Sequence, residues 1–163
     1  MSALRVRQAA ISRGDYDSGF EELDAVTLAA DLSPERQVSV LMRLAEAAVL
    51  RGRVDRGLES LAKARAVLDR VLESTPRRFD LRVERAELLL RKASVAIERF
   101  EDARPDLEAA TEDLGAALER EPAHRGWQVL LADLARGWAA EAVADGRLGA
   151  ADRDLAHAQA VLE

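Results

Sequence analysis

The sequence predicts an all-α protein, built as an array of about four antiparallel helical hairpins with eight helices in total. Three observations indicate this class. Apolar residues recur at helical spacing along almost all of the 163 residues, the helix-favouring residues Ala, Leu, Arg and Glu dominate the composition, and no stretch alternates as a strand does. Hydrophobic residues make up 48% of the chain, which is enough for the core of one domain.

Breaks in the helical periodicity divide the chain, expected to be a single domain over 1–163, into hairpins at 2–30, 34–73, 77–120 and 125–162. The expected helices within them span 2–13, 16–30, 34–51, 54–73, 77–102, 106–120, 125–144 and 148–162. The helix at 77–102 is the longest of these, so the array is expected to be irregular in its third hairpin.

Turn residues stand at the breaks. Gly14, Gly52 and Gly146 each follow a periodic stretch, where a left-handed backbone ends a helix at little cost. Ser33 and Thr75 each precede a proline, which predicts a hydroxyl N-cap followed by Pro in the first helical position. Such short connections make consecutive helices antiparallel.

Two stretches of the sequence repeat the same arrangement. Residues 13–23, RGDYDSGFEEL, and 51–61, RGRVDRGLESL, share Arg, Gly, Asp, Gly, Glu and Leu at matching places. The second Gly of each lies early in a helix, and Leu follows four residues later on the same helix face. A small residue there allows two helices to cross closely, and the Leu fills the space one turn later. The later hairpins use Ala in place of Gly, which gives the pairs Gly19–Leu23, Gly57–Leu61, Ala110–Leu114 and Ala151–Leu155.

This pattern resembles the tetratricopeptide repeat family. The matching residues are Gly14, Tyr16 and Gly19, the stretch LAEAAVLRGRVDRGLESLAKA at 44–64, the stretch AALEREP at 116–122, and Trp127. The resemblance implies a right-handed solenoid in which neighbouring hairpins stack into a continuous core.

The resemblance also implies a function. Members of this family are usually non-catalytic scaffolds, which hold a partner peptide or helix along the face lined by the first helix of each hairpin. On that geometry, the groove residues of this chain are Gln8, Met42, Glu46, Lys92, Arg99 and Arg136. Their mixed chemistry predicts a protein or peptide ligand that is polar and partly acidic.

The expected helix at 77–102 carries two stripes. An apolar seam alternates steps of four and three, as helices do when they pack in an array, through Phe79, Val83, Ala86, Leu90, Ala93, Ile97 and Phe100. A basic stripe runs beside the seam and consists of Arg78, Arg82, Arg85, Lys92 and Arg99. Either these basic side chains lie over the seam and pair with nearby acids such as Glu87 and Glu98, or they form a positive strip that binds an acidic peptide.

Two further alternatives stay open at the level of sequence. The chain is either an interaction module or a self-assembling structural protein, a homodimer formed through the seam of the helix at 77–102. Trp127 and Trp138 lie three helical turns apart and share a face, so they either pack between hairpins or present an aromatic anchor to a partner.

Other function classes receive no support. The chain has no cysteine, and its two histidines have no partners at metal-binding or base-and-orienter spacing, so no metal, cofactor or catalytic residue is predicted. Glu121 and His124 imitate a di-metal spacing, but once only and across a helix break, which favours a solvated loop. An enzyme with an unfamiliar helical site is the third and weakest possibility.

Charge and hydropathy bear on partners and location. The net charge of −6 argues against a nucleic-acid partner, because that binding depends on clustered Lys and Arg. The chain lacks a signal peptide and an apolar run long enough for a membrane, so a cytoplasmic location without membrane contact is expected. The strong preference for Arg over Lys suggests GC-rich codons and a bacterial source.

Overall fold

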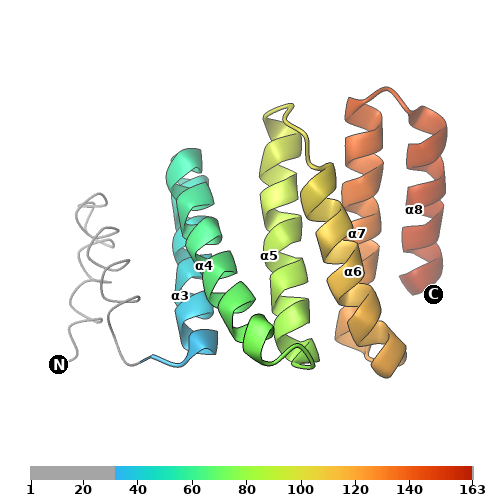
Figure 1. Cartoon of the computed structure of the whole chain (residues 1–163). Coiled ribbons are helices and arrows are strands. Elements are labelled where there is room, and N and C mark those ends of the chain that lie inside the picture. The colour runs from blue at the N-terminus through green and yellow to red at the C-terminus, as the bar shows by residue number, and fades with distance from the viewer. Residues whose placement is uncertain (1–31, 163) are drawn as a thin grey trace. The chain divides into compact units, whose positions relative to one another are not determined.

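The computed structural model describes residues 32–162, the side chains of 157–162 apart, and this part of the chain is all helical (Figure 1). Six helices and no strand occur among these residues: α3 (Pro34–Leu50), α4 (Val54–Ser74), α5 (Phe79–Glu98), α6 (Arg104–Arg120), α7 (Arg125–Ala144) and α8 (Leu148–Leu162). The all-α prediction is therefore confirmed for the described residues. The expected helices at 2–13 and 16–30, with Gln8, Gly14 and Gly19, lie outside them, so an array of eight helices is not confirmed.

The chain consists of two compact units, residues 1–70 and 71–163, with the boundary inside α4. In the first unit α3 and α4 cross closely at Gly57. A Cβ atom at Gly57 would lie 2.7 Å from Val49 Cγ2 and 3.1 Å from the carbonyl oxygen of Ala45. Leu61, one turn later, is buried. The predicted close crossing at this repeat is therefore confirmed.

In the second unit α5, α6, α7 and α8 stand side by side, and successive helices run in opposite directions (Figure 1). The helix α7 packs against α5, α6 and α8. The fully buried side chains of this unit are mainly leucines from α5 and α6: Leu81, Leu88, Leu89, Leu107 and Leu114. Ala110 and Ala151 are buried as the repeat predicts, but Leu155 is 49% exposed, so the last pair of the repeat is not a packed pair.

Three helices end with the same hydrogen-bonding pattern. The backbone N–H groups of Arg53, Glu101 and Arg147 each donate to a carbonyl five residues earlier, at 2.9, 2.8 and 2.7 Å, after α3, α5 and α7 respectively. This bond requires a left-handed residue just past the helix, as in a Schellman motif. Gly52 and Gly146 supply it with φ of 74° and 73°, which confirms their predicted role.

At the end of α5 the left-handed residue is Phe100, with φ of 58°. The helix therefore stops at Glu98 and does not continue to residue 102 as expected, because the chain turns without the glycine that usually marks such a turn. With 20 residues, α5 is as long as α7. The expected irregularity of the third hairpin rested on an overlong first helix, and that basis was wrong.

The predicted cap position is confirmed at α3, where Pro34 takes the first helical position, but neither predicted hydroxyl makes a capping bond. Ser33 occupies the N-cap position of α3, before Pro34, but its side chain makes no capping bond. The Thr75 hydroxyl donates backward to the carbonyl of Val71, at 2.7 Å, and so closes α4 instead of opening α5. The next helix begins only at Phe79, after the turn that contains Pro76.

Candidate functional site

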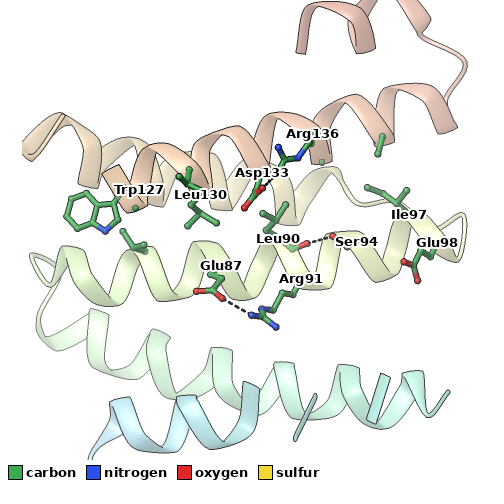
Figure 2. Close-up of a pocket in the computed structure, with 15 residues that line it drawn as sticks. Glu87, Leu90, Arg91, Ser94, Ile97, Glu98, Trp127, Leu130, Asp133 and Arg136 are labelled. Atoms are coloured by element: carbon green, nitrogen blue, oxygen red, sulfur yellow. Dashed lines mark hydrogen bonds and ion pairs between the residues drawn. The ribbon is translucent and has the colours of Figure 1, made fainter. Parts of the chain in front are cut away.

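An open groove of about 890 Å³ lies between α5 and α7, within the unit of residues 71–163 (Figure 2). These two helices are the first helices of successive hairpins. One wall comes from α5 and the other from α7, and each wall combines apolar side chains with charged ones. Its apolar lining includes Val83, Leu90, Ile97, Trp127, Val129 and Leu130.

The wall on α5 follows from helical periodicity. Val83, Leu90 and Ile97 recur every seven residues and are only half-buried, while their neighbours Leu88 and Leu89 are fully buried in the core. Residues at this spacing share one helix face. The groove face of α5 therefore lies directly beside its core face, and the sequence prediction that the seam packs inside the array was wrong for these three residues.

The other members of the predicted seam divide between core and surface. Ala86 and Ala93 are buried, as predicted. Phe100 is 91% exposed, because the helix has already ended and the left-handed turn directs its side chain outward. The predicted seam is thus divided between three places: Ala86 and Ala93 lie in the core, Val83, Leu90 and Ile97 line the groove, and Phe100 is exposed.

Gly137 allows the α7 wall of the groove to lie close to the neighbouring helices. Gly137 on α7 faces two leucines, and a Cβ atom there would lie 3.0 Å from Leu90 Cδ1 and 3.0 Å from Leu107 Cδ2. The absence of a side chain at this position lets α7 approach α5 and α6. The floor of the groove is consequently narrow and apolar near Leu90.

Trp127 closes one end of the groove. It lies in the first turn of α7, its backbone N–H donates to His124 Nδ1 at 3.3 Å, and the two rings stack with centroids 4.1 Å apart. The sequence prediction of a solvated loop at His124 missed this capping role. Trp138 has different surroundings, since its Nε1 donates to Thr111 Oγ1 on α6 at 3.2 Å. Only Trp127 of the two lines the groove.

The charged side chains of the groove are mostly paired. Arg91 donates to Glu87 at 2.8 Å, one turn earlier on α5, and Arg136 pairs with Asp133 on α7 (Figure 2). Glu98, at the end opposite Trp127, makes no ion pair with any described residue. The groove therefore carries one uncompensated negative charge at that end.

The basic stripe of α5 faces α6. Arg85 makes two hydrogen bonds to Asp113, at 2.6 and 2.8 Å, and Arg82 lies 3.6 Å from the same carboxylate, which is almost fully buried. Lys92 pairs with Asp106 at 2.9 Å. These two carboxylates lie on α6, so the stripe holds the two helices of the hairpin together.

The two ends of the stripe pair locally. Arg78 lies 2.7 Å from Asp80, and its hydrogen bonds to that carboxyl lower the pKa of Asp80. Arg99 lies 2.8 Å from Glu101. All five cations of the stripe are thus engaged within the chain, but with acids other than the Glu87 and Glu98 that the sequence suggested.

The remaining predicted binding residues are scattered. Met42 and Glu46 lie on α3, in the unit of residues 1–70, where Met42 is half-buried and Glu46 is exposed. Of the predicted binding residues that the structure describes, Arg136 alone lines the α5–α7 groove. The groove residues that sequence reasoning missed are the aliphatic ones, whose spacing is the same as that of core residues.

No family model, curated protein or solved structure matches this chain. Within residues 32–162 no three His, Cys, Asp or Glu side chains gather as a metal site needs. None of the described helices is long and apolar enough to cross a membrane.

Proposed function

We propose that this chain is a non-catalytic protein-interaction module, similar to the tetratricopeptide repeats, that takes a helical segment of a partner protein in the α5–α7 groove. One observation carries the proposal. The groove is lined by half-buried aliphatic side chains and a tryptophan, from the first helices of two successive hairpins. In a repeat array this is the face that a ligand contacts.

The dimensions of the groove suit a helix. On α5 its lining runs from Val83 to Glu98, which at 1.5 Å per residue is a length of about 22 Å. A partner helix of about four turns spans that length. Its apolar face would cover Val83, Leu90 and Ile97, and Trp127 would contact it at one end, as aromatic anchors do in protein interfaces.

The basic stripe is a poorer binding face than the sequence suggested. An acidic ligand would have to draw Arg85 from Asp113, or Lys92 from Asp106. Each of these carboxylates is buried, and leaving a buried charge without its partner costs about 3–5 kcal/mol. A surface ion pair with a ligand returns only about 0.2–1 kcal/mol. We therefore place the partner in the groove.

The test uses a peptide of about 14 residues that forms an amphipathic helix, with leucines along one face and uncharged ends. In a Trp138→Phe chain the fluorescence reports Trp127 alone. We expect a saturable blue shift, because the bound peptide removes water from that ring. The Trp127→Phe chain, which retains Trp138 beside Thr111, should show no shift.

Two substitutions on α7 provide a matched pair. Val129 is 43% exposed and lines the groove, whereas Val143 is 53% exposed and does not. Val129→Asp should weaken the peptide at least tenfold, since it places a charge against the apolar ligand face, and Val143→Asp should not change the affinity. The proposal fails if Trp127 emission does not respond, or if both variants weaken binding equally.

A second candidate function rests on Phe100. A phenylalanine that is 91% exposed at the end of α5 is suited to a homodimer contact. Self-assembly predicts a dimer, seen by light scattering at several concentrations, that Phe100→Asp converts to a monomer. A monomer at all concentrations would favour the interaction module.

A further inference from the structure

We infer that the segment bound in the groove carries lysine or arginine at the end that meets Glu98, so that its charge is opposite to that of the acidic peptide suggested by the sequence. This inference rests on the proposed docking in the α5–α7 groove. Apolar side chains line the groove along its whole length, and the distribution of the charged side chains among them specifies the occupant.

The two ends of the groove differ. At the Trp127 end the neighbouring lining residues are Val83, Gly126 and Val129, which carry no charge. In the middle, the charged residues are already paired with each other, as Glu87 with Arg91 and Asp133 with Arg136. The unpaired Glu98 stands at the far end. A ligand therefore meets a neutral end, a neutralised middle and a negative end.

A second cavity, of about 270 Å³, continues the groove beyond Glu98. Ile97 lines both spaces. Four carboxylates and one guanidinium line the second cavity, together with Ile97, Phe100 and Ala144; the charged residues are Glu101, Asp102, Glu141, Asp145 and Arg104. The charge of its lining is negative, in the same sense as Glu98.

The arginines of this region reduce that charge without cancelling it. Arg104 donates to Glu141 at 2.5 Å and also pairs with Asp145, which raises the pKa of Arg104. Arg147 pairs with both of these acids, and Arg99 pairs with Glu101. This end of the groove thus has three arginines and five carboxylates, namely Glu98 and the four of the second cavity. Its net charge is about −2.

Phe100 adds an aromatic surface at the same place. Its ring is 91% exposed and its backbone is left-handed, where the equivalent helix ends after α3 and α7 have glycine. A left-handed conformation is more costly for a residue with a side chain than for glycine. An exposed aromatic ring beside carboxylates suits the aliphatic stem and cationic head of lysine or arginine.

The experiment compares two peptides with the full-length chain. Both are helices of about 14 residues with the same leucine face, and they differ only in the last two residues, which are lysines in one and glutamates in the other. Affinity is measured from Trp127 emission in the Trp138→Phe background. We expect the lysine peptide to bind about tenfold more tightly at low salt, and the difference to shrink below about twofold at 1 M salt, where the Debye length is about 3 Å.

A charge reversal locates the effect. Glu98→Lys should abolish or invert the preference for lysine, because it turns an attraction into a repulsion. Glu119 is an exposed glutamate on α6 that lines neither space, so Glu119→Lys provides the matched control and should keep the preference.

The outcomes separate the two proposals. If neither peptide binds, the docking in the groove is wrong. If both bind with equal affinity, if the glutamate peptide binds more tightly, or if Glu98→Lys and Glu119→Lys act alike, the groove binds helices but the inference about a basic end is overturned.

Discussion

Replacing Asp113 by alanine should strongly destabilise the unit of α5 to α8. The Asp113 side chain is 2% exposed and accepts two hydrogen bonds from Arg85, with Arg82 at 3.6 Å. In the alanine variant, the guanidinium groups of Arg85 and Arg82 would lose this carboxylate as their counter-ion. The variant therefore measures whether the basic stripe of α5 serves the hairpin itself.

The magnitude follows from burial. Removing one partner of a fully buried ion pair costs about 3–5 kcal/mol. The side chains of Arg85 and Arg82 are 25% and 23% exposed, so water can partly solvate them after the change. We therefore expect a loss of about 2–3 kcal/mol in the free energy of unfolding. With a urea m-value of about 1–3 kcal/mol/M, the midpoint should fall by about 0.7–3 M.

The assay is urea unfolding followed by circular dichroism, with Glu112→Ala as control. Glu112 is the exposed neighbour of Asp113 on α6, and its replacement should change stability by no more than about 0.5 kcal/mol. A double-mutant cycle with Arg85→Ala should give a coupling energy of about 1–3 kcal/mol. If Asp113→Ala is as stable as Glu112→Ala, the stripe does not hold α5 to α6, and the acidic-ligand hypothesis for it regains its place.

Three further predictions concern stability. Gly57→Ala should destabilise the chain by about 1–3 kcal/mol in urea unfolding, because its Cβ would collide with α3. Gly115→Ala is the control and should stabilise the chain by up to about 1 kcal/mol, because a Cβ there meets nothing within 4 Å. Equal effects of the two substitutions would contradict the close crossing of α3 and α4. Phe100→Gly should stabilise the chain by about 1 kcal/mol in the same assay, and a loss would show that the ring packs on something. Arg78 lowers the pKa of Asp80 in the folded chain. The pair therefore stabilises the fold fully above the unfolded pKa of about 3.9, and this stabilisation is lost as the pH falls through the folded-state pKa. The difference between the chain and Asp80→Asn, about 0.2–1 kcal/mol at pH 6, should therefore vanish in acid, and a difference that grew as pH fell would have the wrong sign.

Helix positions could be predicted because local signals specify most of them. Gly52 and Gly146 mark helix ends by a conformation that glycine adopts at low cost, and both have it. The end of α5 could not be predicted in this way. Phe100 makes the same turn, but phenylalanine does not mark a helix end in a sequence, and this one falls at the next position of the apolar seam.

The candidate site depends on tertiary contacts that sequence spacing does not show. The partners of Arg85 and Lys92 are 28 and 14 residues away on the next helix, beyond the reach of the helical rule that suggested Glu87 and Glu98. Core and groove residues of α5 also have the same seven-residue spacing. Only the packing of neighbouring helices decides that Leu88 is buried while Leu90 lines an open groove.

Photo-cross-linking in cells that express this chain tests most directly whether the α5–α7 groove holds a partner protein. A benzophenone amino acid replaces Ser94, which is exposed in the groove, or Glu119, which is exposed on α6 outside it. We expect a discrete protein adduct from position 94 that the leucine-faced peptide suppresses, and none from position 119. Equal adducts at both positions, or an adduct at position 94 that the peptide does not suppress, would contradict the proposed docking.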